Sequence, residues 1–247
     1  LGLSPNQMAQ ALGLAASQGA GLREMFGSMN KCLHVGKAAQ NGLLAALLAA
    51  RGFTSSLQSL EAPRGFCRVL SDSPHPEALT SGWGSRWEIL SAGFKPYPCG
   101  VVIHPAIEAI LALHDEQGVR PEAVAHIKAH CHPMVLELTG KAAPTTGLEG
   151  KFSIYHCLAA ALTDGMVGSA TFTDARVADP AMAALRQLIQ VETDPGLAPD
   201  QARGTVKLAA GPELAVFIEH AAGSPEHPLT DGQLAQKFAT LAAGRLA

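Results

Sequence analysis

The sequence predicts an α+β fold in which helices come first, a mixed sheet follows and a helix closes the chain. Before Trp87 the apolar residues recur at helical spacing, and after it several short segments alternate apolar and polar residues as strands do. Gly211 and Pro212 separate the last two of these segments, which indicates an antiparallel hairpin. Strands and helices do not alternate regularly, so a βαβ repeat is disfavoured. With 47% hydrophobic residues among 247, the chain can bury a sizeable core.

The part before Trp87 is predicted to be mostly helical. Ser4 suits a helix cap, and Pro5 suits the first helical position of the run that follows. Four leucines share one face of the next helix, and Gly52 ends it. The predicted elements, in chain order, are a helix over residues 5–14, a helix over 36–50, a short helix over 56–61, and a loop or domain crossover over 62–85.

After Trp87, helices and strands are interspersed. Residues 124–130 alternate apolar and polar side chains, as a half-buried strand does. Ser153 suits the cap of the helix that follows it, and Asp231 stands near the start of the last helix. The predicted helices cover residues 105–114, 154–163, 180–188 and 230–246. The predicted strands cover residues 124–130, 189–193, 205–209 and 214–219.

The charge balance and the apolar pattern exclude several classes of protein. There are 18 basic and 21 acidic residues, for a net charge of −3. Non-specific binding to nucleic acid or to an anionic membrane requires a dense positive field, so neither partner is expected. No apolar run reaches the ~20 residues that span a bilayer. No signal-peptide pattern stands at the start, and because the chain begins with Leu1 rather than Met we expect its beginning to be missing.

The five cysteines lie far apart, and no C-x-x-C pair exists. Zinc ribbons and ordinary iron–sulfur clusters therefore have no support in the sequence. An odd number of cysteines in a nearly neutral chain is typical of reduced thiols, which predicts a cytoplasmic protein. The nucleotide-binding motif G-x-G-x-x-G, the P-loop and the G-x-S-x-G nucleophile elbow are all absent.

Three basic residues, Lys31, His34 and Lys37, are spaced three apart and precede or enter the predicted Leu-rich helix. A helix N-terminus carries partial positive charge, so basic groups there repel it unless an anion lies among them. The free N–H groups after Gly36 would bind the same anion. A small di- or tricarboxylate is the natural candidate, with the lysines as point charges and the histidine as proton carrier. The alternative is a solvated basic patch.

A second candidate segment runs from Lys95 to Pro105. Two prolines make this segment stiff and extended, which fixes the direction of Lys95. Pro105 suits the first position of a helix, so His104 is expected at the cap. Histidine is a poor cap, which indicates that it holds a ligand or a partner loop. The alternative is a simple entry into a helix with an exposed lysine.

A third candidate segment carries Tyr155 and His156 at the start of a helix that follows a Gly-rich loop. A phenol or an imidazole placed there can face a cleft, although a tyrosine on a helix of small residues is also common in a core. His130 and His132 form H-x-H, which on a strand places both rings on one face, as in some zinc sites. Since Pro133 ends that strand, an exposed strand end explains the pair better, and no metal is expected.

Together these segments resemble the MmgE/PrpD family, which includes 2-methylcitrate dehydratase, cis-aconitate decarboxylase and iminodisuccinate epimerase. The motifs occur in family order and span nearly the whole chain, yet they cover only the C-terminal half of a typical member. The matching motifs are Lys31-x-Leu-His34-x-Gly36-x-Ala-Ala-Gln40 with the following Gly42-Leu-Leu-Ala-Ala, Lys95-Pro-Tyr-Pro-Cys99 with His104-Pro-Ala-Ile, Lys151-Phe-Ser-Ile-Tyr-His156, and Glu226-His-Pro-Leu-Thr-Asp231 with Lys237-Phe.

The resemblance implies a large all-helical domain, a smaller α+β lid and an active site in the cleft between them. Members of the family are typically homodimers and need no metal or other cofactor. Residues 1–92 would belong to the helical domain, 93–222 would form the lid, and 223–247 would return to the helical domain. The family takes several catalytic residues from an N-terminal region that this chain lacks, so we expect the chain alone to be inactive.

The resemblance also assigns roles to residues. Lys31 and His34 match the basic motif on the helical side, and Lys95 matches the lysine at the lid entrance. In the decarboxylase a catalytic histidine follows that lysine by five residues, where this chain has Gly100. The catalytic tyrosine of the decarboxylase aligns with His156, one place after Tyr155. The expected catalytic residues are His34, His156 and Tyr155, and the expected substrate-binding residues are Lys31, Lys37, Lys95 and His104.

The resemblance implies a metal-independent lyase that dehydrates a small polycarboxylic acid such as 2-methylcitrate, in propionate metabolism. Removing a proton next to a carboxylate forms an enolate-like species, which needs a tuned base and fixed positive charge. The two departures at Gly100 and His156 disfavour decarboxylation. One alternative is an epimerase or isomerase of an amino-dicarboxylate such as iminodisuccinate, and the other is a non-catalytic fragment that binds carboxylates.

Overall fold

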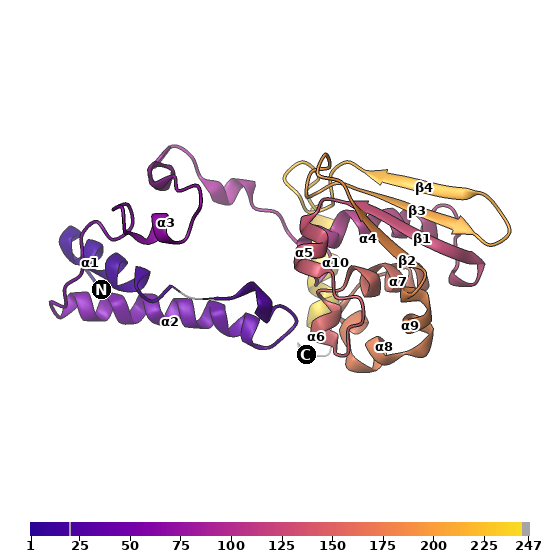
Figure 1. Cartoon of the computed structure of the whole chain (residues 1–247), viewed down its shortest axis with the longest axis horizontal. Coiled ribbons are helices and arrows are strands. Elements are labelled where there is room, and N and C mark those ends of the chain that lie inside the picture. Colours follow the sequence, from indigo (N-terminus) through magenta and orange to yellow (C-terminus); the bar gives the residue numbers. More distant parts are fainter. Residues whose placement is uncertain (20, 244–247) are drawn as a thin grey trace. The chain divides into compact units, whose positions relative to one another are not determined.

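The computed structural model describes residues 1–19 and 21–243 of the chain. The chain divides into two compact units, Leu1–Trp87 and Glu88–Ala247 (Figure 1). The first unit is helical, and the second combines helices with a four-stranded sheet. The α+β fold class is therefore confirmed. The expected domain limits at residues 92 and 222 stay predictions.

The first unit is built on the packing of two helices against each other. Its helices are α1 (Pro5–Ala16), α2 (Asn30–Ala50) and the single turn α3 (Phe66–Val69). Ser4 caps α1 as expected: its hydroxyl accepts from the Gln7 N–H (3.3 Å), while the Gln7 side chain accepts from the Ser4 N–H (3.0 Å). This reciprocal pairing satisfies two N–H groups that a helix start otherwise leaves free.

The start of α2 corrects the sequence prediction. The helix begins at Asn30, six residues before the expected Gly36, and continues unbroken through that glycine. Nothing lies within 4 Å of the place where a Cβ of Gly36 would stand. A glycine inside a helix costs about 1 kcal/mol relative to alanine, which one exposed position tolerates when the helix continues on both sides. Gly36 was therefore wrongly taken as a helix start.

The short helix predicted over residues 56–61 is absent, and the chain there forms turns. The carbonyls of Ser59 and Leu60 accept instead from the N–H groups of Phe66 and Cys67, at 2.8 and 3.0 Å. The carbonyls of Ser59 and Leu60 are therefore already occupied by donors from across the loop. They are not available to accept the hydrogen bonds that would continue a helix beyond residues 56–61. The helical turn of this region is α3, inside the segment that was expected to be a loop.

The second unit alternates short helices with strands. Its helices are α4 (His104–Asp115), α5 (Met134–Thr139), α6 (Gly147–Gly150), α7 (Ile154–Asp164), α8 (Asp174–Ala178), α9 (Pro180–Arg186) and α10 (Asp231–Ala242). Its strands are β1 (Val124–Cys131), β2 (Ile189–Thr193), β3 (Ala202–Leu208) and β4 (Glu213–Ile218). The short helices α5, α6 and α8 were not predicted.

The sheet has the order β2-β1-β3-β4 and is mixed, as the sequence predicts. β1 pairs parallel with β2 and antiparallel with β3, and β3 and β4 form the expected antiparallel hairpin. β3 begins at Ala202, three residues earlier than predicted, because the Cys131 end of β1 supplies a partner for Ala202. That pairing joins residues distant in sequence, so local alternation did not reveal it.

The core of the second unit lies between one face of the sheet and the helices α4 and α7 (Figure 1). Ser153 caps α7 as expected, with its hydroxyl accepting from the His156 N–H at 3.1 Å. α7 ends at Gly165, whose φ of +62° is the left-handed conformation that glycine adopts without a steric penalty. Most residues of both helices are buried, which gives this unit a continuous apolar interior.

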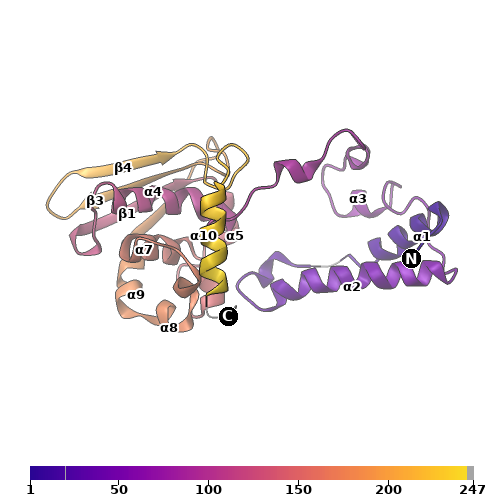
Figure 2. The same ribbon diagram turned by 180° about the vertical axis from the view of Figure 1, so that it is seen from behind.

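The closing helix α10 belongs to the second unit and is visible from behind in Figure 2. Thr230 caps it, and Lys237 Nζ donates to the carbonyl of Lys95 at 2.6 Å. The last residues of the predicted helix, 244–246, lie outside the described residues. Among the residues that are described, no helix combines the length and apolar character needed to cross a membrane.

Candidate functional site

The three basic residues that the sequence singles out in the first unit lie on one side of α2. Lys31, His34 and Lys37 follow at intervals of three along the helix, so each is rotated by only about 60° from the previous one. The helix N-terminus expected after Gly36 does not exist, because the N–H groups there bond within α2. An anion at this place would therefore be held by side chains rather than by free backbone donors.

A cavity of about 370 Å³ opens between α1 and α2, lined by His34, Lys37 and Asn41. Asn41 is buried, and its amide nitrogen donates to the Gln18 carbonyl at 3.1 Å. Its amide oxygen has no partner among the described residues. Lys37 Nζ donates to Gln40 Oε1 at 3.2 Å. The cavity thus offers positive charge, a titratable ring and a free acceptor, which suit a ligand with carboxylate and hydroxyl groups.

Lys95 stands in an exposed loop that is tied to its surroundings through the backbone. Its ammonium donates to the carbonyl of Cys99 at 3.2 Å, and its own carbonyl accepts from Lys237. The loop is anchored further where the Gly100 N–H donates to the Lys151 carbonyl at 3.0 Å. The two prolines keep the segment extended between these anchors, as the sequence indicates.

His104 is the first residue of α4 and not its cap, which corrects the expected position. A turn of 3-10 helix over Val101–Ile103 runs directly into α4, and Ile103 takes the cap position. The ring of His104 is 1% exposed and meets the edge of Tyr97, with ring centroids 5.2 Å apart. Its Nε2 has no hydrogen-bond partner in the described part of the chain. An unpaired buried nitrogen is costly, so this atom is a candidate for contact with a ligand or water.

His104 and Lys95 line the same cavity, which has a volume of about 320 Å³. The structure therefore brings together two of the residues singled out in the sequence of this unit. Asp200 also lines the cavity, and its carboxylate is 2.8 Å from Nδ1 of His220. That hydrogen bond raises the pKa of His220. The cavity combines an ammonium, an imidazole and largely apolar walls, which suit one carboxylate of a small acid.

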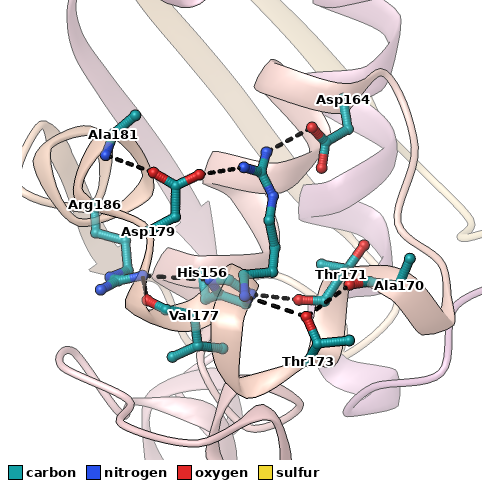
Figure 3. A network of polar contacts seen from close by, with 10 residues as sticks. His156, Asp164, Ala170, Thr171, Thr173, Val177, Asp179, Ala181 and Arg186 are labelled. Atoms are coloured by element: carbon teal, nitrogen blue, oxygen red, sulfur yellow. Dashed lines mark hydrogen bonds and ion pairs between the residues drawn. The ribbon is translucent and has the colours of Figure 1, made fainter.

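His156 occupies a buried network and not a cleft (Figure 3). Its Nε2 donates to the carbonyl of Thr171 at 2.9 Å, and its Nδ1 lies 3.4 Å from Nη1 of Arg186. Since Arg186 can only donate, Nδ1 must be the acceptor, and the ring is neutral. Burial lowers the pKa of His156, with the charge of Arg186 contributing in the same direction. This geometry favours a structural role for His156.

Charged residues surround this network. Arg176 bridges α7 and the loop before α9 by binding Asp164 and Asp179, each at 2.6 Å. Arg186 also donates to the Val177 carbonyl at 3.0 Å. Tyr155, the neighbour of His156, is half-buried and packs against the apolar core. Sequence analysis missed Arg176 and Arg186, because nothing in the local pattern shows that they reach α7 from other segments.

The two thiols Cys99 and Cys157 are a second feature that sequence analysis missed. Their Sγ atoms lie 3.8 and 3.7 Å from the carbonyl oxygens of Gly100 and Gly150. The pKa of Cys99 is lowered to about 6, with the Cys157 thiol as the main cause and with His104 and Lys95 acting in the same direction. Burial raises the pKa of Cys157 well above its usual range. The residues are 58 positions apart in the sequence, so only the fold reveals the pair.

Metal-ligating side chains come together at one place among the residues described. Asp200, His220 and Glu226 each offer a ligand atom, and these atoms lie within 4.8 Å of one another. The hydrogen bond between Asp200 and His220 accounts for much of this proximity without an ion. His130 and His132 do not form a site: His130 faces Glu192 at 3.4 Å, and His132 lies beyond β1, where its Nδ1 accepts from the Met134 N–H.

Comparisons with known proteins cover nearly the whole chain. A family model described as the MmgE/PrpD N-terminal domain matches residues 1–79, and one described as the MmgE/PrpD C-terminal domain matches residues 97–247. A cis-aconitate decarboxylase of Aspergillus terreus is 31% identical over 193 residues, which are 70% of this chain and 39% of that protein.

Mammalian relatives are similar over longer stretches. The cis-aconitate decarboxylase of Mus musculus is 26% identical over 202 residues, or 79% of this chain and 41% of that protein. The human protein of the same name is 24% identical over 248 residues, or 96% of this chain and 51% of that protein. The chain thus spans about half the length, or less, of the curated relatives that it matches.

Proposed function

Because the chain belongs to the MmgE/PrpD family, we propose that it is part of a metal-independent lyase that dehydrates a small polycarboxylic acid such as 2-methylcitrate. The observation that carries this proposal is the cavity shared by Lys95 and His104, in which a buried imidazole nitrogen has no protein partner among the described residues. A substrate carboxylate beside Lys95 would satisfy the ammonium and the free nitrogen together.

Dehydration begins with removal of a proton from the carbon next to a carboxylate. Negative charge then moves onto the carboxylate oxygens, and fixed cations that already face this carboxylate stabilise the charged intermediate without rearranging. Lys95 is assigned this role, and Lys31 is proposed to bind a substrate carboxylate, with Lys37 and His104 as further substrate contacts. The low polarity of the cavity around His104 strengthens the electrostatic contacts that Lys95 and His104 would make there.

Of the two histidines proposed as proton carriers, His34 is favoured over His156. His34 is half-buried at the wall of its cavity, and its ring makes no hydrogen bond to another described residue. Its nitrogens are therefore free to make a hydrogen bond to a bound substrate, as a group that transfers a proton must. Both nitrogens of His156 are already engaged, so proton transfer there would first require the breaking of buried hydrogen bonds. Tyr155 remains the candidate from α7.

A specific observation bears on decarboxylation, which the names of the relatives suggest as the second candidate function. The resemblance to the decarboxylases leads us to expect a catalytic histidine at position 100, where this chain has glycine. A Cβ at Gly100 would stand 2.5 Å from Cγ2 of Thr139, whose hydroxyl is held by the Val135 carbonyl. This position has no room for a side chain, which supports dehydration over decarboxylation.

The test uses the full-length protein that contains this chain, and its Lys95→Ala and Lys31→Ala variants. Their turnover is measured on four acids: 2-methylcitrate, citrate, cis-aconitate and iminodisuccinate. We expect unsaturated product from 2-methylcitrate and a loss of about a hundredfold or more in kcat/KM for each variant. Lys207→Ala is the matched control, because Lys207 is an exposed lysine of β3 that bonds only to the Gly211 carbonyl. Unchanged turnover in both lysine variants would refute the assigned roles.

The four substrates also separate the alternatives. Release of carbon dioxide from cis-aconitate would identify a decarboxylase, and loss of optical rotation with iminodisuccinate would identify an epimerase. Binding of these acids without turnover by the protein would identify a carboxylate-binding fragment. We further propose a homodimer that acts in the cytoplasm, which light scattering and cell fractionation would test.

A further inference from the structure

Among the described residues of the first unit, one polar side chain is buried, and it lies where α1 and α2 pack together. The buried residues of α2 are Asn41, Ala45 and Ala49, which recur every four residues and so share one face. Those of α1 are Ala11 and Gly13, which carry no polar side chain. Asn41 is 7% exposed, and an amide buried to this degree costs free energy unless both its nitrogen and its oxygen are hydrogen-bonded.

The structure provides a partner for the amide nitrogen of Asn41 and none for its oxygen. Nδ2 donates to the Gln18 carbonyl at 3.1 Å, which ties α2 to the segment that follows α1. Because a carbonyl oxygen only accepts, this bond also fixes the orientation of the amide: the nitrogen must be the atom that faces Gln18. Oδ1 has no partner among the described residues. A structural role therefore explains the nitrogen and leaves the oxygen unexplained.

Asn41 lines the cavity of about 370 Å³ between α1 and α2, whose volume is in the range of small-molecule sites. Apolar side chains such as Leu12 and Phe66 form much of its wall. Lys37 provides positive charge there, and its bond to Gln40 is exposed, so a carboxylate can replace it. A small acid that places one carboxylate at Lys37 would present its remaining groups to the other residues of the wall, Asn41 among them.

We propose that Asn41 is a specificity-determining residue, which selects acids that carry a hydroxyl over acids that carry carboxylates alone. An ionised carboxylate only accepts hydrogen bonds, and Oδ1 also only accepts, so the two oxygens repel each other. A hydroxyl, in contrast, donates to Oδ1 and satisfies it. The amide cannot turn to offer its nitrogen to a carboxylate, because its oxygen would then face the Gln18 carbonyl. The preference for a donor is therefore fixed by the bond between Asn41 and Gln18.

This inference rests on the proposed function, because it takes the ligand to be the polycarboxylic substrate. 2-Methylcitrate and citrate each carry one hydroxyl, which dehydration removes. Their unsaturated products have no hydroxyl, so they would leave Oδ1 of Asn41 unpaired. A site built to bond a hydroxyl rejects an analogue that lacks it, because the buried partner then loses its hydrogen bond. Asn41 would thus hold the hydroxy acid before the reaction and favour release of the product after it.

The test compares two acids that differ in the hydroxyl alone: 2-methylcitrate and its deoxy analogue, in which hydrogen replaces the hydroxyl. Titration calorimetry at low temperature, where turnover is slow, measures both dissociation constants for the full-length protein that contains this chain. We expect 2-methylcitrate to bind about tenfold or more tightly than the deoxy acid. The absorbance of unsaturated product, followed in separate samples at higher temperature, reports the proposed function independently.

The two readouts distinguish failure of this inference from failure of the proposed function. If product forms and the two acids bind equally, Asn41 does not select for the hydroxyl, and water rather than the ligand pairs with Oδ1; the proposed function then stands without this inference. If neither acid binds and no product forms, the ligand class is wrong, and both proposals fail together.

Substitution of Asn41 separates recognition from a purely structural role. Asn41→Ala removes the acceptor and should bring the ratio of the two dissociation constants close to one, and Asn41→Leu does the same if the alanine variant does not fold. Loosening of the contact between the helices would instead weaken both acids alike and keep the ratio. Ser17→Ala is the matched control, because the Ser17 hydroxyl bonds the Gly13 carbonyl at 3.1 Å and does not line the cavity. A ratio that stays unchanged in the Asn41 variants would overturn the assignment.

Discussion

The two units of the chain bury their apolar residues very differently. Among the described residues of the first unit, the buried apolar residues are three alanines, Ala11, Ala45 and Ala49. Many of its large apolar side chains are exposed, including Leu43 at 59% and Trp83 at 82%. The second unit holds a continuous core of isoleucine, leucine, valine and alanine between the sheet, α4 and α7.

This difference shows that the second unit is stabilised by burial of its own apolar side chains. Burying a leucine or isoleucine side chain contributes about 1.5–3 kcal/mol, whereas an alanine contributes far less because it removes little surface from water. The second unit accumulates many large contributions, and the first has to rely on helix propensity, caps and the contact of α1 with α2. Two helices with so little buried area are marginal in water. Its exposed leucines therefore indicate a surface that a further partner would have to cover.

The largest expected effect is on the folding of separated units. Residues 88–247 produced alone should be monodisperse and should unfold in one cooperative transition, because their core is complete. Residues 1–87 produced alone should aggregate or bind a hydrophobic dye such as ANS, since their large side chains have no cover. Size-exclusion chromatography and thermal unfolding check both outcomes. If residues 1–87 alone were soluble and folded cooperatively, the inferred difference in stability between the two units would be wrong.

A matched pair of leucine truncations gives the next largest effect. Leu158→Ala removes a side chain that is fully buried in α7, and it should lower the free energy of unfolding by about 2–5 kcal/mol. Leu43→Ala removes an exposed side chain of α2, so its effect should be within about 0.5 kcal/mol. Urea unfolding followed by circular dichroism measures both. Equal effects would mean that Leu43 is covered in solution.

The pH dependence of the second unit should be the smallest of these effects. Burial lowers the pKa of His156 in the folded state, so at moderately acidic pH the unfolded chain binds more protons at this residue than the folded chain does. The contribution of His156 to stability should be complete above about pH 6.5, the ordinary value of the ring, and should decline as the pH falls below it. His156→Asn, which cannot titrate, should flatten this decline.

The control for the pH experiment is His220→Asn. Asp200 raises the pKa of His220, so this ring has the opposite dependence: its contribution is present below about pH 6.5 and is lost as the pH rises through the folded value. Removal of His220 should therefore change the pH dependence only above about pH 6.5 and leave the decline in acid in place, whereas removal of His156 should flatten that decline. A decline that His156→Asn leaves unchanged would show that another group controls acid sensitivity.

The elements that were predicted correctly are those whose signals are local. The cap at Ser4, the strand β2 and the cap at Ser153 depend on neighbouring residues, and each is found where the sequence indicates. The early start of β3 and the turns over residues 56–61 depend instead on partners elsewhere in the chain. Local periodicity contains no information about such partners, which is why these two predictions were wrong.

The candidate site divides in the same way. The types and spacing of Lys31, His34 and Lys37 marked them as unusual, and the structure places His34 and Lys37 at one cavity. Their chemistry was visible in the sequence because charge is a property of each residue. The burial of His156 was not visible, since it depends on Thr171 and Arg186 reaching the ring from other segments.

The sequence by itself determined the fold class, the family and the motifs rich in lysine and histidine. All three depend only on the types of residues and on their spacing over short stretches of the chain. The tertiary structure alone decided which of those residues are neighbours. It placed Lys95 and His104 at one cavity and enclosed the ring of His156. The physical reason is that burial and charge–charge distance arise from contacts between segments far apart in the chain, and these two quantities set the pKa and the reactivity of each group.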